Sequence, residues 1–395
     1  MRKVAVVGYG NTPFKRRHIE KTYPRLAYEA VKEAFDSTGI RPERVDSVIY
    51  GIYSDPFNHN MMPDLHIHYQ LGLARKPSTR VSAGGATGGI AVRSAFMEIA
   101  SGMKDIVLVV GVEKYGDLSN VFEMIKALTF GGDQLFEQMA GVSPAGSYSA
   151  PVILHMLKYG TTEENLALVS VKNHANAMRN PDAQAPMEIT VEEVLSSPMI
   201  IYPYKLLDHC LNSEGACALL LADEESARRL TDNPVWIKGI GCSTESGRQA
   251  ERDNVGESLL PAVEAAAREA YAMAGVKDPV RDIQVAEVYD SFSGIEILLY
   301  EELGFCARGE GAACLEEGSY SMGGELPVNP SGGLIGGEHA VGATGVYQVA
   351  EIARQLQGEA GERQVKGAER GLALSLGGAR GAYASATVLE VQDNG

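Results

Sequence analysis

The chain has 395 residues, 45% of them hydrophobic, and a formal net charge of −16 at pH 7. This length supports roughly two to three domain-sized units with large cores, whereas the acidity disfavours nucleic acid and anionic membrane as main partners. No run of about twenty apolar residues is present, which excludes a transmembrane helix. The first residues lead straight into a strand pattern without the apolar core or cleavage site of a signal peptide, so we expect a cytoplasmic protein.

Strand and helix patterns recur in the same order in two halves, which we place at residues 1–230 and 231–395. In the first half we expect a strand at 4–8, a helix at 26–35, a strand at 48–51, a Gly-rich loop leading into a helix at 89–100, and a strand at 106–110. In the second half we expect a strand at 235–240, a helix at 259–271, a strand at 285–288, a Gly-rich loop leading into a helix at about 342–356, and strands at 372–376 and 382–391. This order predicts an α/β fold of two duplicated βαβ-type halves with helix-covered sheets.

Residues 115 to about 150 interrupt the repeat. They are rich in Gly, Ser and Pro around one short helical pattern at 121–128. Long connections of this kind frequently cover a functional site, so we predict an inserted covering loop here.

Cysteine and histidine spacing gives no sign of a metal site or of a secreted disulfide framework. The cysteines are Cys210, Cys217, Cys242, Cys306 and Cys314. We expect buried, reduced thiols. His66 and His68 lack a third ligand motif, and we expect no bound metal.

Several short motifs occur in a fixed order along the chain. They are VAVVGYGNTPF at 4–14, SAGGATGG at 82–89, HMLKYG at 155–160, SEGA at 213–216, VYDSF at 288–292, YEELGFC at 300–306, NPSGG at 329–333 and HAVGATG at 339–345. Together they resemble the thiolase superfamily over essentially the whole chain, and in particular its lipid-transfer-protein-like and archaeal members. The resemblance implies a five-layered α/β/α/β/α thiolase fold in which both Gly-rich loops face one shared site.

The same resemblance implies partners and substrates. The substrate would be an acyl-CoA, with coenzyme A as a substrate moiety and no covalently bound cofactor. A homodimeric core is expected. The steroid side-chain aldolases and some acyl-CoA thiolases of this branch work with a small zinc-ribbon and OB-fold protein, which makes such a protein a candidate partner here.

The nucleophile of the family is missing. Where thiolases carry a cysteine followed by a small residue, Ser or Thr, and Gly, this chain reads Gly85-Ala86-Thr87-Gly88. Gly85 cannot be acylated, so ordinary thiolase chemistry through an acyl-cysteine is excluded at this position. None of the five cysteines lies in either Gly-rich loop, so another thiol could reach the site only through a tertiary contact.

Four side chains remain as catalytic candidates by resemblance. His339 stands where thiolases have the His of their Gly-His-Pro motif, and Tyr289 replaces the His of the His-Asp-Cys-Phe motif. Asp290 and Asn329 complete the two motifs. The steroid side-chain aldolases also lack the cysteine and have a tyrosine in the first motif, but they have a second tyrosine where this chain has His339.

Other residues are candidates for binding the substrate. Backbone amides near Gly85, Ala86 and Gly378 would serve as oxyanion donors. Phe122 and Phe130 of the covering loop would line a pocket for a bulky or aromatic acyl group, although such aromatics frequently serve as the packing of the loop itself. For the CoA phosphates the cationic candidates are Lys205, Arg380 and the basic segment 15–18.

These residues fit retro-aldol cleavage of a β-hydroxyacyl-CoA, which needs a base, enolate stabilisation and a proton donor but no acyl-enzyme. The residues do not decide whether Tyr289 or His339 is the base. Two alternatives stay open. His339 could activate a CoA thiol for thiolysis of a β-ketoacyl-CoA or for the reverse Claisen condensation, or the chain could be a non-catalytic thiolase-like subunit of a complex.

Overall fold

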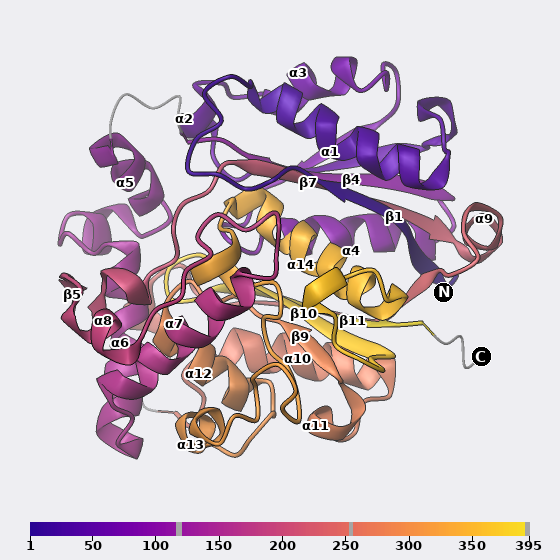
Figure 1. The fold of residues 1–395 in the computed structure, drawn as a ribbon. Helices are drawn as coiled ribbons and strands as arrows, with labels where there is room; N and C mark the ends of the chain where they lie inside the picture. Colours follow the sequence, from indigo (N-terminus) through magenta and orange to yellow (C-terminus); the bar gives the residue numbers. More distant parts are fainter. Residues whose placement is uncertain (116–120, 253–255, 392–395) are drawn as a thin grey trace.

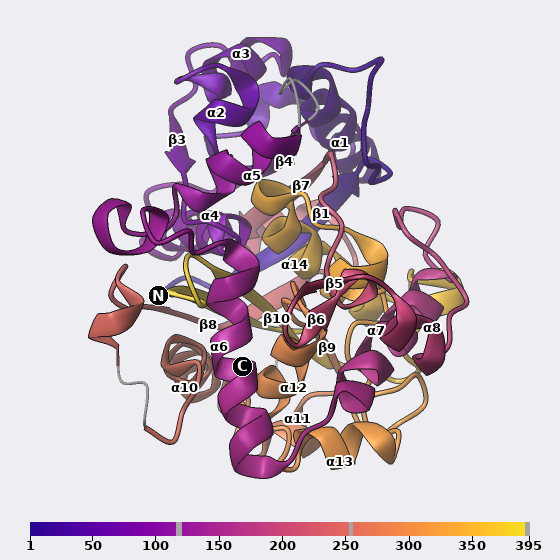
Figure 2. The same ribbon diagram turned by 90° about the vertical axis from the view of Figure 1, so that its left-hand side faces the viewer.

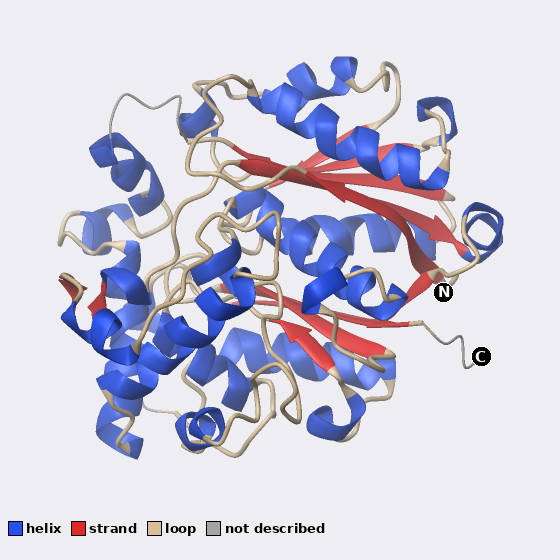
Figure 3. Ribbon diagram, in the orientation of Figure 1, coloured by secondary structure: helices blue, strands red, loops and turns tan. Residues whose placement is uncertain are grey.

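The computed structural model describes residues 1–115, 121–252 and 256–391. Within them a nine-stranded sheet runs in the order β3-β2-β4-β7-β1-β8-β11-β10-β9. Its strands are β1 (Val4–Asn11), β2 (Ser47–Gly51), β3 (Ser78–Val81), β4 (Ile106–Glu113), β7 (Gly215–Asp223), β8 (Val235–Thr244), β9 (Val285–Glu287), β10 (Arg370–Gly377) and β11 (Tyr383–Glu390). In the described part of the chain β1 and β8 pair at two positions only. The sheet therefore has two parts, which lie one above the other in Figures 1 and 3.

Helices cover the two parts of the sheet and fill the space between them. Above lie α1 (Tyr23–Thr38) and α3 (Pro63–Gln70), between the two parts lie α4 (Thr87–Ala100) and α14 (Val341–Gln357), and below lie α10 (Pro261–Ala274) and α12 (Ser293–Glu302) (Figure 1). Leu26, Val346 and Leu298 belong to three hydrophobic clusters, one for each of these helical layers. The five layers expected from the sequence are confirmed.

The other elements surround this core, mainly on the side where α4 and α14 begin (Figure 2). They are α2 (Asp55–Asn58), α5 (Val121–Thr129), α6 (Pro144–Tyr159), α7 (Glu163–Ala177), α8 (Val191–Ser196), α9 (Glu224–Leu230), α11 (Pro279–Asp282), α13 (Gly311–Glu316) and the small hairpin of β5 (Met199–Ile201) and β6 (Tyr204–Lys205). No helix of the described residues is both long and apolar enough to cross a membrane.

The repeated strands and helices are found where the sequence predicts them, with small differences at their ends. The covering segment is more helical than expected, because α5, a π-helical turn at Gln134–Gln138 and the start of α6 occupy much of it. Ser143 caps α6 by accepting a hydrogen bond from Gly146 N, and Pro144 takes the first helical position. The Ser and Pro content of this segment suggests a loop, but Ser143 and Pro144 instead form the start of a helix. Residues 116–120 of this segment lie outside the described residues.

The two central helices approach each other very closely at their N-terminal ends. A Cβ on Gly88 would lie 2.5 Å from Val346 N, and a Cβ on Gly345 would lie 2.4 Å from Gly89 N. Only glycine permits this distance between the two backbones. Since each Gly-rich loop leads into one of these helices, the contact brings both loops to one place.

A buried carboxyl links the same region to the upper part of the sheet. Glu113 ends β4, and its Oε2 accepts hydrogen bonds from Tyr53 N at 3.0 Å and Gly342 N at 3.1 Å. Burial raises the pKa of the Glu113 carboxyl to about 8. The carboxyl is therefore largely protonated in the folded protein at neutral pH.

Replacing Glu113 with Gln tests the raised pKa of the Glu113 carboxyl. Because the folded pKa of about 8 lies above the ordinary value of 4.5, the contribution of the carboxyl to stability is complete below pH 4.5 and is lost as the pH rises through 8. Between pH 6 and pH 9 the wild-type protein should lose about 3 kcal/mol more unfolding free energy than Glu113→Gln. Urea unfolding at both pH values measures the difference, and equal losses would contradict the raised pKa.

Candidate active site

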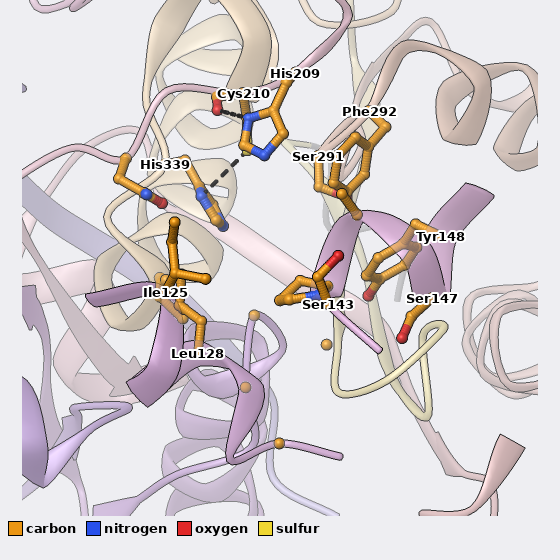
Figure 4. A pocket seen from close by; sticks show the side chains of 18 of the residues that line it. Ile125, Leu128, Ser143, Ser147, Tyr148, His209, Cys210, Ser291, Phe292 and His339 are labelled. Carbon is orange, nitrogen blue, oxygen red and sulfur yellow. Dashed lines mark hydrogen bonds between the residues drawn. The ribbon is translucent and has the colours of Figure 1, made fainter. Parts of the chain in front are cut away.

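A cavity of about 900 Å³ opens at the N-terminal ends of α4 and α14. Both Gly-rich loops line it, together with the segment 206–212, helix α5 and the start of α6 (Figure 4). The N-terminus of a helix carries partial positive charge, so this end of the two central helices favours a developing negative charge.

Tyr289 and His339 meet in this cavity. Tyr289 follows β9, His339 precedes α14, and Tyr289 Oη lies 2.7 Å from His339 Nε2. Ser213 fixes the main chain of His339, because its Oγ accepts from His339 N at 2.9 Å and its N donates to His339 O at 3.0 Å. The two side chains proposed as acid and base are therefore hydrogen-bonded to each other.

The Tyr289 hydroxyl fills the space that a side chain at residue 85 would need. A Cβ built on Gly85 would lie 2.0 Å from Tyr289 Oη and 2.3 Å from Leu376 O. The first contact is with a side chain and the second is with the backbone of β10. A cysteine at residue 85 would thus require both to move, so the site is rebuilt around the glycine.

Cys210 is a residue of the cavity that the sequence analysis did not select. Its Sγ lies 3.3 Å from His339 Nδ1 (Figure 4), and the thiol is buried and free. The tertiary contact that would bring a thiol to the site therefore exists. No local spacing could indicate it, since Cys210 and His339 are 129 residues apart.

Burial keeps these three side chains neutral. It raises the pKa of the Tyr289 phenol and of the Cys210 thiol well above their ordinary values. It lowers the pKa of His339 to about 3, and the neighbouring His209 adds to the effect. At neutral pH a neutral imidazole therefore lies between a protonated phenol and a protonated thiol.

Asp290 and Asn329 lie behind the cavity and do not line it. Asp290 accepts hydrogen bonds from Leu334 N at 2.6 Å and Ile335 N at 3.1 Å, and Asn329 Oδ1 accepts from Val288 N at 2.8 Å. Asn329 has φ of 55°, which asparagine tolerates better than most residues. Both side chains hold the chain on either side of Tyr289. These contacts give Asp290 and Asn329 a supporting place behind Tyr289, and a direct catalytic role for them stays a prediction.

The loop between β10 and β11 is held by Tyr148 of α6. Tyr148 Oη donates to Gly378 O at 3.0 Å and accepts from Gly381 N at 3.2 Å. Gly378 and Gly85 both line the cavity. The first Gly-rich loop and the loop between β10 and β11 thus present backbone to the same space, and their role as oxyanion donors stays a prediction.

Ala86 differs from these glycines, because it is fully buried and does not line the cavity. Its N donates to Ala83 O at 3.2 Å. The Thr87 hydroxyl also serves the loop, since it accepts from Ala83 N at 2.8 Å and donates to Gly84 O at 2.6 Å. The Ala86 amide is therefore occupied within its own loop, and its role as an oxyanion donor stays a prediction.

Phe122 and Phe130 do not line the cavity either. Their side chains are 78% and 53% exposed, whereas Met124, Ile125 and Leu128 line the cavity from the same segment. Positions 124, 125 and 128 share one side of a helix, and position 122 lies outside it. The covering segment thus contributes to the cavity through the face of α5 opposite Phe122, and Phe130 follows the end of that helix.

The basic residues expected to bind the CoA phosphates fall into two groups. Arg16 and Arg17 are exposed and line the cavity, so they stand at its mouth. Lys205 is paired with Glu163, and Arg380 is buried.

His66 and His68 lie on α3, and no group of three or more potential metal ligands occurs among the described residues.

Comparisons with known proteins identify the family to which this chain belongs. The family model "Thiolase, N-terminal domain" matches residues 4–196, and "Thiolase C-terminal domain-like" matches residues 244–390. The chain is 40% identical over 393 residues to the acetyl-CoA acetyltransferase of Methanothermobacter thermautotrophicus, covering 97% of this chain and 98% of that one. It is 34% identical over 390 residues to Homo sapiens sterol carrier protein 2, covering 95% and 70%. The solved Ltp2-ChsH2(DUF35) aldolase matches with a TM-score of 0.85 and 27% identity, covering 99% and 98%.

The five-layered fold, the two facing Gly-rich loops and these similarities show that the chain belongs to the thiolase family. Within the family it stands close to the lipid-transfer-protein-like branch that its motifs indicate, beside sterol carrier protein 2 and the Ltp2 aldolase.

The variant Gly85→Ala tests whether Tyr289 and Leu376 fill the space beside residue 85. The methyl group would press on Tyr289 Oη and Leu376 O, so we expect a loss of about 1–3 kcal/mol in unfolding free energy and loss of activity. Gly146→Ala is the control, because its Cβ would meet no atom closer than 3.5 Å. Thermal unfolding compares the two, and an unchanged Tm for Gly85→Ala would contradict the steric argument.

Proposed function

We propose that this enzyme breaks or forms the carbon-carbon bond next to a CoA thioester without an acyl-cysteine, and that its favoured reaction is retro-aldol cleavage of a bulky β-hydroxyacyl-CoA. The observation that carries the proposal is the Tyr289 hydroxyl, which fills the nucleophile's space above Gly85 and is hydrogen-bonded to neutral His339. The hydrogen-bonded Tyr289–His339 pair therefore occupies the position at which thiolases attach the acyl group to their cysteine.

The residues supply each requirement of the reaction. The Tyr289–His339 pair takes the proton from the β-hydroxyl, the Cα–Cβ bond breaks, and its electrons move into an enolate on the thioester oxygen. The backbone around Gly85, at the N-terminus of α4, and the backbone of the β10–β11 loop at Gly378 stabilise that oxygen. Return of the proton to Cα releases an acyl-CoA and an aldehyde or ketone.

The cavity supports a large acyl group. Its volume of about 900 Å³ lies in the upper range of small-molecule sites. Met124, Leu128 and Phe292 give it apolar walls, whereas Arg16 and Arg17 stand at the mouth. We assign the apolar interior to the acyl chain and the two arginines to the phosphates of CoA.

We include a partner in the proposal. The similar Ltp2 aldolase is described together with ChsH2(DUF35), which supports a partner protein for this chain. We propose a homodimeric core that works with a small zinc-ribbon and OB-fold protein, as the family resemblance implies. The assay below is therefore carried out with and without such a protein.

Thiolysis or Claisen condensation of a β-ketoacyl-CoA is the second candidate. It is favoured by the thiol of Cys210 beside His339 and by the 40% identity to an acetyl-CoA acetyltransferase. It is disfavoured by the closed space at Gly85, which leaves no room for an acyl-enzyme there.

The deciding experiment is mass spectrometry of the products from matched β-hydroxyacyl-CoA and β-ketoacyl-CoA pools with free CoA. We expect an aldehyde or ketone from the hydroxy substrates. A second acyl-CoA formed from the keto substrates would instead establish the thiolase reaction. No product from either pool, with or without the partner, would favour a non-catalytic subunit.

Variants of the pair test its role. Tyr289→Phe and His339→Gln should each lower kcat by roughly 10²–10⁴-fold, with KM little changed, because each removes a proton-transfer group. Tyr320→Phe is the matched control, since Tyr320 is a buried tyrosine that does not line the cavity. Steady-state kinetics on the cleaved substrate measures the effect. A kcat in Tyr289→Phe equal to that of the control would contradict the assignment.

A further inference from the structure

Cys210, His339 and Tyr289 form a hydrogen-bonded row. Tyr289 Oη contacts one ring nitrogen of His339 at 2.7 Å, and Cys210 Sγ contacts the other at 3.3 Å. The thiol therefore lies on the far side of the imidazole from Tyr289 and Gly85. It does not stand in for the missing nucleophile, because the imidazole separates it from the space that a nucleophile at residue 85 would occupy.

The two contacts favour one arrangement of hydrogens. A neutral imidazole accepts at one nitrogen only, and a tyrosine O–H is a much better hydrogen-bond donor than a cysteine S–H, so the short contact is best formed by Tyr289 O–H donating to Nε2. The ring hydrogen is then on Nδ1 and points at the Cys210 sulfur, which is a weak acceptor. The opposite tautomer would place a hydrogen on Nε2 and block it as a base.

We propose that Cys210 is a positioning residue whose sulfur accepts the Nδ1–H of His339 and thereby keeps Nε2 free to receive the proton of Tyr289. This inference rests on the proposed retro-aldol function and assigns the order of its proton transfers. The arrangement follows the general pattern in which a third group orients the base.

The proton path then has a direction. The β-hydroxyl gives its proton to Tyr289 Oη as the tyrosine gives its own proton to Nε2, and the Cα–Cβ bond breaks to leave the enolate. Tyr289 next protonates Cα and recovers its proton from Nε2. His339 ends neutral, and no oxidant or other reactant is required.

A second observation places a substrate group beside this row. Ser291 lines the cavity, and its buried Oγ has no hydrogen-bond partner among the described residues. Ser291 O accepts from Cys210 N at 3.1 Å, which joins the two residues. Figure 4 shows Ser291, Cys210 and His339 around the same space. A buried hydroxyl without a partner is costly, and a polar atom of the bound substrate would satisfy it.

The first test is the tautomer of His339, read by nitrogen-15 NMR of histidine-labelled wild-type protein without substrate. His339→Gln identifies the signal. We expect hydrogen on Nδ1, whereas hydrogen on Nε2 would overturn the inference. Because no turnover is needed, this result is independent of whether the retro-aldol reaction is found.

The second test is kinetic and uses Cys210→Ala and Cys210→Ser. Alanine should lower kcat by roughly tenfold to a hundredfold with KM unchanged, less than removal of a direct proton-transfer group, and serine should restore most of the rate by accepting the same hydrogen. Cys242→Ala, which removes a thiol outside the cavity, is the control.

Two results would contradict the inference. One is an unchanged kcat in Cys210→Ala. The other is an acyl group found on Cys210 by peptide mass spectrometry after incubation with acyl-CoA, which would make the thiol a nucleophile. Circular dichroism checks that each variant is folded. If a Cys210 variant does not fold, the NMR measurement on the wild-type protein still decides the tautomer of His339.

Discussion

The backbone contact between α4 and α14 is the constraint from which the site follows. Each helix begins directly after a Gly-rich loop, and Gly88 and Gly345 let the two helices touch at that end. Residues about 250 positions apart, Gly85 and His339, therefore share one cavity. A side chain on either contact glycine would separate the helices and with them the two loops.

The cavity built on this contact depends on buried polar groups. Asp290 and Asn329 fix the backbone on both sides of Tyr289, Tyr148 fixes the loop at Gly378, and Glu113 ties the start of α14 to β2. None of these groups needs to touch a substrate. The burial of Tyr289 and His339 themselves keeps the imidazole neutral and the phenol protonated.

Much of the fold and part of the site could be predicted from the sequence. Alternating strands and amphipathic helices gave the order of elements because their spacing is local, and the glycine at residue 85 was visible because the surrounding loop has a fixed motif. Tyr289 and His339 were found for the same reason. Whether they act on a substrate stays a prediction.

What the sequence could not supply depends on three-dimensional contacts. Cys210 meets His339 only through the fold, and the face of α5 that lines the cavity is set by how the helix packs, which is why Phe122 was misplaced. Asp290 illustrates the reverse case. Its motif was recognised, but only the structure showed that its oxygens are occupied by backbone amides.

The closed space above Gly85 also has a consequence for redesign of this site. With Tyr289 in place, any side chain at residue 85 collides with its hydroxyl, and a second collision awaits it at the carbonyl oxygen of Leu376 in β10. Exchanging Tyr289 for a smaller residue would remove only the first collision. A cysteine nucleophile therefore cannot be installed at residue 85 by one or two side-chain substitutions, because the backbone of β10 must also move.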